Sequence, residues 1–302
     1  MSDRNNTVGF IGMGMMGGGM AANLLKADFD MVAYDIDPAK NELFSGLGAK
    51  IANGPAGVAE GASTIICIVE TSSQVRDVVL GDGGILEGAQ EGDIFVCSAT
   101  VDPIMVRELH DILAEKGINM LDAPVSGGVP RAESGELSII VGGDIAVVDA
   151  CRPYFEAMSS NIFHMGEIGL GLAMKLCNNM ITQVTKVVAA EAMALGTKAG
   201  LDPQSMYDVI TVSTGNSDSF RAAVPRYLSG DFSPGGTIDI SYKDQELETA
   251  FAKALGVPMF MATASQQVYQ MARAAGYNKN DGSVLIKLYE EMIGIQLGPR
   301  QD

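Results

Sequence analysis

The chain has 302 residues, 47% of them hydrophobic, and a formal net charge of −17. This length predicts two domains with substantial apolar cores. An acidic chain without a basic patch repels phosphate backbones and anionic headgroups, so nucleic acids and membrane surfaces are not expected partners.

The first predicted element is an apolar strand, Val8–Ile11, that runs directly into a GxGxxG motif. Gly12 would permit a tight turn, Gly14 would let backbone approach a pyrophosphate, and Gly17 would let a helix, predicted at Met20–Lys26, pack on the strand. We therefore interpret the loop as a dinucleotide site rather than a glycine-rich turn that only packs. The loop residues assigned to the cofactor are Gly12, Met13, Gly14, Met15, Met16 and Gly17.

Asp35 closes the next apolar run, which is predicted as a strand at Met31–Tyr34. A carboxylate at this place accepts hydrogen bonds from a ribose 2′-hydroxyl and repels a 2′-phosphate. Asp35 therefore favours NAD over NADP as the cofactor. The alternative is a turn aspartate that precedes Pro38.

An uncharged run, Thr7–Leu25, raises the alternative of a membrane or secretory segment. Six glycines interrupt it, whereas a spanning helix needs about 20 mostly apolar residues. The cysteines show no CxxC spacing, so we expect reduced, buried thiols and neither a disulfide nor a metal site. We therefore predict a soluble, cytoplasmic protein without a leader. The cysteines are Cys67, Cys97, Cys151 and Cys177.

Apolar runs alternate with helical patterns through the first half, which predicts an α/β fold with a doubly wound, Rossmann-type sheet. Helices are expected at Pro103–Lys116 and Ile145–Met158, and Pro153 should break or kink the second. The remaining predicted strands are Thr64–Val69, Ile94–Cys97, Asn119–Leu121, Leu137–Val141 and Asn161–His164.

After Gly171 the strand signals stop, which predicts a dinucleotide-binding domain at residues 1–165 and a helical substrate and dimerisation domain at 166–302. Residues Leu172–Ala199 are typical of one long interdomain helix, because they contain no proline. Their apolar residues lie on too many sides for a surface helix, so we expect burial at a domain or subunit interface. Further helices are predicted at Pro203–Thr211, Ile238–Leu255, Pro258–Ala275 and Ser283–Ile293.

Oxidation of an alcohol with a nicotinamide cofactor needs a group that takes the hydroxyl proton. The two histidines, His110 and His164, accompany no polar cluster and are interpreted as structural. Lys175 is the stronger candidate because it shares a helix face with Asn179, so an amine and an amide can point at one ligand. Apolar neighbours would desolvate this ammonium and lower its pKa. The alternative is a lysine whose amine reaches the surface.

Four motifs resemble those of the β-hydroxyacid dehydrogenase family, in that family's order. They are GFIGMGMMGGGMAANLL at the start, DAPVSGG at Asp122–Gly128 followed by SIIVGG, GxGxxxKxxNN at Gly169–Asn179, and YKDQEL around Lys243–Asp244. Four motifs at fitting spacings rarely coincide by accident, so the chain is identified from its sequence as a member of this family.

The resemblance implies roles for particular residues. Lys175 corresponds to the catalytic lysine, Asn179 to a substrate-orienting amide, and Lys243 to a residue that reaches cofactor and substrate. Members of the family are usually dimers or tetramers, so a homo-oligomer is expected. The loop that holds the substrate carboxylate corresponds to Ser126, Gly127 and Gly128. The positions that line the nicotinamide and ribose correspond to Val69, Glu70, Gln74 and Thr100.

Three residues depart from the family's pattern. Glu70 stands where proline is common and Ala99 where a hydroxyl residue is usual, which alters the geometry expected around the nicotinamide. Arg131 stands where a small residue is frequent, and it follows the carboxylate-binding loop. We hypothesise that it binds a second anionic group on the substrate. The alternative is a surface ion pair with Glu133 or Glu136.

These observations predict an NAD-dependent dehydrogenase that interconverts a small 3-hydroxy acid and its semialdehyde or keto acid, with Lys175 as general acid and base. Similarity to threonate dehydrogenases and tartronate semialdehyde reductases at Ala190–Leu201 and Gly215–Ser217 leaves the particular acid open. One alternative is a decarboxylating phosphogluconate dehydrogenase, whose pattern has a histidine where Asn178 stands. Imine reductases replace the lysine, and non-catalytic cofactor-binding modules lose it.

Overall fold

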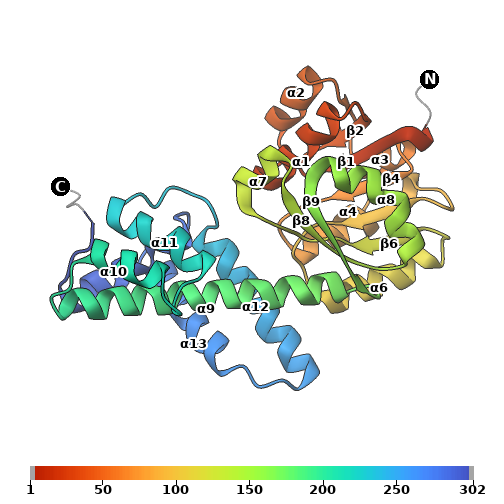
Figure 1. The fold of residues 1–302 in the computed structure, drawn as a ribbon. Helices are drawn as coiled ribbons and strands as arrows, with labels where there is room; N and C mark the ends of the chain where they lie inside the picture. Colours follow the sequence, from red (N-terminus) through yellow and green to blue (C-terminus); the bar gives the residue numbers. More distant parts are fainter. Residues whose placement is uncertain (1–3, 299–302) are drawn as a thin grey trace. The chain divides into compact units, whose positions relative to one another are not determined.

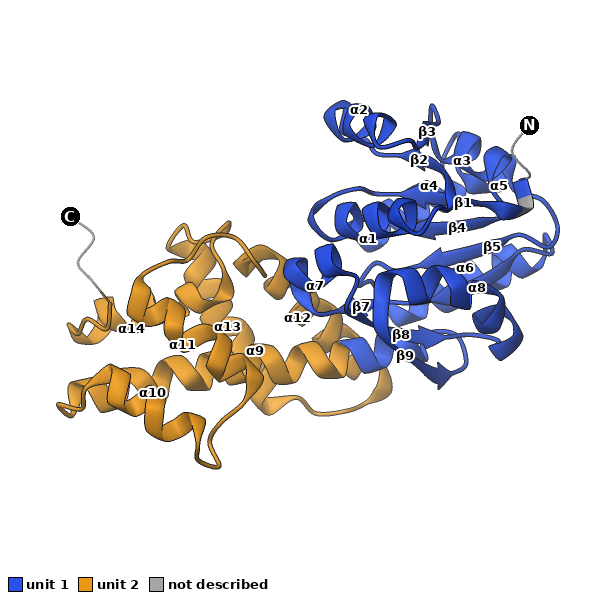
Figure 2. Cartoon of the chain, turned by 45° about the horizontal axis from the view of Figure 1, so that its top comes forward, with its two compact units in different colours: residues 1–175 blue, residues 176–302 orange. Residues whose placement is uncertain are grey.

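The computed structural model describes residues 4–298. The chain divides into two compact units, residues 1–175 and 176–302, which Figure 2 colours separately. The start of the long helix belongs to the first unit, because Leu172 is part of that unit's apolar core. The functional boundary expected between residues 165 and 166 stays a prediction.

The first unit is built on one sheet with the strand order β3-β2-β1-β4-β5-β6-β8-β7, and β9 pairs with β8. Figure 1 shows this sheet with β1, β2, β4, β6, β8 and β9 labelled. Strands β1 to β6 are parallel, β8 is antiparallel to β6 and β7, and β9 is parallel to β8. The described strands are β1 (Thr7–Ile11), β2 (Asp30–Tyr34), β3 (Lys50–Ile51), β4 (Thr64–Cys67), β5 (Ile94–Cys97), β6 (Asn119–Asp122), β7 (Val125–Ser126), β8 (Leu137–Gly142) and β9 (Ser159–Gly166).

Helices cover both faces of this sheet, which confirms the doubly wound prediction. Alternate strand residues point to opposite faces, so Ile66 and Val96 pack with α1 and α8, whereas Ile65 and Phe95 pack with α3 to α6. A short 3-10 helix at Arg4–Asn6 precedes β1. The α-helices are α1 (Met15–Lys26), α2 (Pro38–Gly46), α3 (Pro55–Gly61), α4 (Ser72–Leu80), α5 (Ile85–Gly88), α6 (Pro103–Ala114), α7 (Gly128–Ser134) and α8 (Ile145–Met158).

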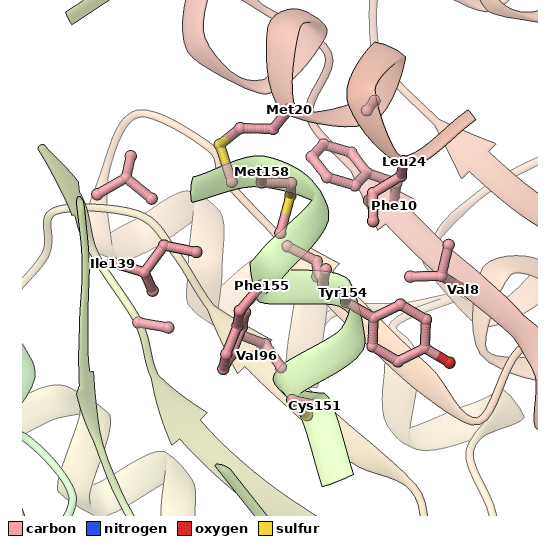
Figure 3. Close-up of a cluster of buried hydrophobic side chains, with 14 of the residues drawn as sticks. Val8, Phe10, Met20, Leu24, Val96, Ile139, Cys151, Tyr154, Phe155 and Met158 are labelled. Atoms are coloured by element: carbon pink, nitrogen blue, oxygen red, sulfur yellow. The ribbon is translucent and has the colours of Figure 1, made fainter. Parts of the chain in front are cut away.

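Helix α8 has the predicted bounds, and Pro153 does not break it, so that part of the expectation is wrong, whereas a kink stays a prediction. Pro153 lies on the exposed side of an unbroken helix. The opposite side packs on the strand side chains of the sheet (Figure 3). Burying a large apolar side chain contributes about 1.5–3 kcal/mol, and several such side chains outweigh the roughly 3 kcal/mol that an interior proline costs. The packed helix residues are Cys151, Tyr154, Phe155 and Met158.

The predicted strand Thr64–Val69 ends earlier, at Cys67. The chain then turns, and the Ile68 carbonyl packs against Gly12. Strands β3 and β7 were not predicted, because two residues are too few to show an alternating pattern. Helix α1 begins at Met15, before the predicted Met20, because the helix includes the glycines that obscure its pattern.

The second unit is helical, as predicted, and α9 is one continuous helix, Leu170–Lys198. Helices α10 and α12 have the predicted bounds, whereas α11 was not predicted and contains Pro225, a residue that usually ends a helix. The apolar core joins Met193 of α9, Tyr227 of α11 and Leu285 of α14. The elements are α10 (Pro203–Thr211), α11 (Asp218–Ser229), α12 (Ile238–Leu255), α13 (Phe260–Ala274), a 3-10 helix (Gly282–Val284) and α14 (Leu285–Ile293).

One side of α9 is exposed within this chain, so the expected burial of that side at a subunit interface stays a prediction. Four apolar residues at seven-residue spacing are 44–73% exposed in this chain, although Val187, Ala190 and Met193 are buried. Seven residues make nearly two helical turns, so the exposed residues form one stripe. The stripe consists of Met174, Ile181, Val188 and Leu195.

Within residues 4–298, the helices are too short or too polar to cross a membrane. The four cysteines are unpaired, and Cys67, Cys97 and Cys151 are buried as predicted. Cys177 is exposed, so that prediction was wrong for this residue. It lies two residues beyond Lys175, and two helical residues rotate a side chain to nearly the opposite face of α9.

Candidate functional site

The glycine motif forms the loop between β1 and α1, and the backbone at Gly12 and Gly17 has the predicted tight turn and close packing. Gly12 has a φ of 92°, which favours glycine. A Cβ added at Gly17 would lie 2.0 Å from the Gly12 carbonyl oxygen, so only glycine lets the helix approach the strand this closely. A Cβ at Gly14 would meet no atom within 4 Å. The loop therefore has an open backbone edge at the start of α1, where a helix favours phosphate.

Asp35 connects the end of β2 to this loop. One carboxylate oxygen accepts the Met13 N–H at 2.5 Å, and the other accepts the Asp37 N–H at 2.8 Å. The contact with Asp37 supports the turn interpretation. Each carboxylate oxygen has a further lone pair, so the same side chain keeps acceptor capacity for a ribose hydroxyl.

The residues predicted to line the nicotinamide and ribose lie after β4 and β5, at the edge of the sheet where the parallel strands end. Val69 packs against the position that a Cβ on Gly12 would occupy, at 3.3 Å. The Gln74 side chain accepts the N–H groups of Glu70 and Thr71 at 2.9 and 3.0 Å, and thereby caps α4. Thr100 follows β5. Carboxyl ends of parallel strands are where open α/β sheets bind ligands.

The predicted carboxylate-binding loop follows β6 at the same edge. Ser126 is half-buried, and Gly127 and Gly128 are exposed with φ values of 142° and 72°. The aliphatic stem of Arg131 packs over Gly127, since a Cβ there would lie 2.8 Å from the Arg131 Cδ. Arg131 is exposed, and no ion pair joins it to Glu133 or any other carboxylate within residues 4–298. The surface-pair alternative therefore does not hold.

Asp122 is a site residue that the sequence reasoning missed. It ends β6, is fully buried, and accepts the N–H groups of Gly169 and Leu172 at 2.7 and 2.6 Å. Burial raises the pKa of this carboxyl, while the two backbone donors and Arg107 act in the opposite direction. Asp122 thus anchors the start of α9 to the strand that leads into the Ser126 loop. The signal was present in the sequence, as an aspartate between a strand and a glycine loop.

Lys175 follows this anchored start by three residues along α9. Its side chain is buried, with 9% exposed, which agrees with the expected desolvation and argues against a lysine that reaches the surface. Lys175 and the Ser126 loop both belong to the first unit. The role of Lys175 in proton transfer stays a prediction.

Asn179 lies one helical turn beyond Lys175, and its amide is held in place within the second unit. Its Nδ2 donates to a carboxylate oxygen of Asp244 at 2.7 Å, and its Oδ1 accepts from Asn178 at 3.2 Å. The Lys243 ammonium lies 3.0 Å from the other Asp244 oxygen. Asp244, which is 5% exposed, therefore connects two residues predicted to act on substrate.

Both histidines have local partners, in line with their structural interpretation. His164 Nε2 lies 2.8 Å from the Gly143 carbonyl oxygen, and His110 Nδ1 lies 3.1 Å from Asp111. His110 is on the surface helix α6 and His164 is on the edge strand β9.

Two family models together match most of the chain. The model described as the NAD binding domain of 6-phosphogluconate dehydrogenase matches residues 7–166. The model described as NAD-binding of NADP-dependent 3-hydroxyisobutyrate dehydrogenase matches residues 169–289. The observed glycine loop lies in the first of these segments, and the whole of α9 lies in the second.

Curated relatives match nearly the whole chain. The 2-(hydroxymethyl)glutarate dehydrogenase of Eubacterium barkeri is 34% identical over 99% of this chain and 100% of its own length. The L-threonate dehydrogenase of Cupriavidus necator is 35% identical over 97% of this chain and 98% of its own length.

A solved structure gives the same result for the fold. The 3-hydroxyisobutyrate dehydrogenase of Mycobacterium tuberculosis, solved with L-serine, is 31% identical, covers 94% of this chain and 99% of its own, and superposes with a TM-score of 0.87. The chain therefore belongs to the NAD(P)-dependent β-hydroxyacid dehydrogenase family of oxidoreductases, which includes the 3-hydroxyisobutyrate dehydrogenases.

Proposed function

We propose that this chain uses NAD to interconvert a small 3-hydroxy acid and its semialdehyde or keto acid. The observation that carries the proposal is the burial of Lys175 on a helix that Asp122 fixes to the sheet carrying the glycine loop. A buried amine in a defined position is suited to proton transfer.

The steps assigned to the chain are positioning and proton transfer. The cofactor, when bound along Gly12 to Gly17, supplies hydride acceptance and donation. Ser126 and the backbone N–H groups of Gly127 and Gly128 hold the substrate carboxylate. Lys175 takes the hydroxyl proton during oxidation and returns it during reduction, and Asn179 orients the reacting hydroxyl.

The preference for NAD is assigned to Asp35, whose carboxylate would repel a 2′-phosphate. A ratio of kcat/KM for NAD over NADP well above one is expected, and Asp35→Ala should reduce that ratio about tenfold or more, because it removes the repulsion and the 2′-hydroxyl acceptor together. Asp37→Ala is the matched control at the next turn position. A wild-type preference for NADP would contradict the assignment.

We assign the substrate as an acid with a second anionic group, recognised by Arg131. The Arg131 guanidinium lies beside the carboxylate loop and forms no ion pair within residues 4–298, which supports this assignment. Bidentate recognition of a carboxylate suits arginine. The name of the Eubacterium barkeri relative also specifies a dicarboxylate, 2-(hydroxymethyl)glutarate. Arg131→Ala should raise KM for dianionic acids at least about tenfold more than for monoanionic ones. An equal rise in KM for both classes of acid would show that Arg131 does not recognise a second anionic group.

The experiment that tests the proposed reaction is a panel of hydroxy acids followed by NADH absorbance. The panel contains threonate, glycerate, 3-hydroxyisobutyrate, 2-(hydroxymethyl)glutarate and sulfonated analogues. Acid-dependent NADH formation without loss of carbon dioxide is expected. Release of carbon dioxide would favour the decarboxylating alternative, and NAD binding without turnover of any acid would favour a non-catalytic module.

We further propose a cytoplasmic homodimer or homotetramer. The exposed apolar stripe of α9 supports self-association, and the unpaired cysteines support a reducing compartment. Light scattering on the purified chain should give a mass of two or four protomers, and Leu195→Glu should lower it. A monomer at micromolar concentration would contradict the assembly.

A further inference from the structure

Helix α12 buries more polar than apolar residues, since only Ile238 and Ala252 among its buried residues are apolar. Four of its buried residues recur at helical spacing, and they face α9 and α13. Gln183 of α9 donates to the Ser241 carbonyl at 3.2 Å, and Gln245 donates to Ser265 of α13 at 3.0 Å. We call these α12 residues the polar seam. It consists of Ser241, Asp244, Gln245 and Glu248.

Glu248 is the residue of the polar seam that is buried without a hydrogen-bond partner for its carboxyl group in the described residues. It is 4% exposed, and neither carboxyl oxygen has a hydrogen-bond partner within residues 4–298. One turn earlier on the same face lies Asp244, which is equally buried. Two buried carboxylates this close repel each other, so the pair is stable when one of them holds a proton.

Of the two acids, Glu248 holds the proton, because Asp244 has an N–H donor and an ammonium group beside it that stabilise a negative charge. Asp244 accepts from Asn179 at 2.7 Å and lies 3.0 Å from the Lys243 ammonium. Burial and the Asp244 charge raise the pKa of Glu248 to about 8. In the described part of the chain, no donor reaches either Glu248 oxygen, so nothing there stabilises Glu248 as a carboxylate.

The other titratable groups near Glu248 do not compensate its charge. Tyr269 of α13 is fully buried and neutral, because burial and nearby acids raise the pKa of its hydroxyl. Lys186 of α9 stabilises the charge of Asp281, and its ammonium lies beside Gly282. On α12 itself, the ammonium of Lys243 is paired with Asp244.

We propose that Glu248 is a positioning residue that holds a proton and thereby keeps Asp244 hydrogen-bonded to Asn179. Loss of the proton places a second negative charge one turn from Asp244, repels the Asp244 carboxylate, and releases the Asn179 amide. The kcat/KM of the enzyme therefore falls in alkaline solution. The inference rests on the proposed function only through the substrate-orienting role of Asn179.

Two measurements without substrate test the proton and the contact. Infrared difference spectra between about pH 6.5 and about pH 9.5 should show that wild type loses the stretching band of a protonated carboxyl group. The Glu248→Gln variant should show no such change. Crystal structures at the two pH values should show the Asn179–Asp244 contact intact at the lower and broken at the higher, but intact at both in Glu248→Gln. Glu246→Gln, the same change on the exposed side of α12, should behave as wild type.

A third measurement tests the consequence for catalysis in the oxidation direction, with threonate and 3-hydroxyisobutyrate as probes. Loss of the Lys175 proton creates the base and raises the rate, so a fall in kcat/KM above about pH 8 has another origin. We expect a fall of about tenfold per pH unit in wild type and Glu246→Gln, and none in Glu248→Gln.

The inference is overturned if Glu248→Gln retains the infrared change, if the Asn179–Asp244 contact is the same at both pH values in wild type, or if the alkaline fall persists in Glu248→Gln. If none of the acids is turned over, the proposed function fails. The infrared and crystallographic results still decide whether the proton on Glu248 holds Asp244.

Discussion

Helices α8 and α12 bury residues at the same spacing but use opposite chemistry. The buried residues of α8 are apolar and pack on the sheet of the first unit (Figure 3), whereas α12 buries the polar seam in the second. Apolar burial stabilises a fold without fixing a hydrogen-bonding direction. Buried polar groups cost free energy unless each is satisfied, but they orient their partners. The difference indicates that α8 serves stability and that α12 serves the orientation of Asn179.

The largest expected effect is on the apolar side of this comparison. Phe155→Ala should lower the free energy of unfolding by about 3–5 kcal/mol, because it leaves a cavity between α8 and the sheet. Phe163→Ala, at a side chain that is 49% exposed on β9, is the control and should cost less than about 1 kcal/mol. Urea denaturation measures both. Similar losses in the two variants would break the assignment of α8 to stability.

The polar seam predicts a dependence of stability on pH. Because the pKa of Glu248 is about 8 in the folded chain and 4.5 ordinarily, the folded state holds the proton more tightly. The stabilisation is complete below about pH 4.5 and is lost as the pH rises through about 8, with a total on the order of 5 kcal/mol. Thermal melts of wild type and Glu248→Gln should therefore diverge with rising pH, with the variant more stable near pH 9. Parallel melts would contradict the neutral state of Glu248.

A smaller effect on stability is expected from Asp122, a buried polar residue that lies within the apolar first unit. Asp122→Asn replaces a carboxylate that accepts two N–H groups by an amide, and should cost about 1–3 kcal/mol. It should also lower kcat about tenfold while NAD binding is kept, because the start of α9 positions Lys175. Asp82→Asn on the surface is the control. Loss of NAD binding in step with kcat would show that Asp122 supports the whole unit instead.

Periodicity predicted much of the fold from sequence, because the spacing of apolar residues reports which side of an element is buried. Helix Ile145–Met158 was found this way. Helix Ile238–Leu255 was found with correct bounds too, although most of its buried residues are polar. The predicted break at Pro153 did not occur, because the helix propensity of a single residue does not include the packing of the opposite face of the helix on the sheet.

The chemistry of the site was predicted less completely, because it depends on contacts between distant positions. The glycine loop and Lys175 were found by motif. Asp122 contacts Leu172, which is 50 residues later in the sequence, and Asn179 contacts Asp244, which is 65 residues later. A local sequence pattern therefore predicts neither contact. The proton on Glu248 depends on the burial of Asp244 and Glu248 together, which only the packed helices reveal.

The account depends on Lys175 as the carrier of the proton, and the most direct measurement is kcat of Lys175→Ala beside Lys253→Ala, a surface control on α12. With saturating NAD and the best acid of the panel, Lys175→Ala should lose at least about 100-fold in kcat while it binds NADH as wild type does. Lys253→Ala should be unchanged. Turnover by Lys175→Ala within a few-fold of wild type would contradict the account.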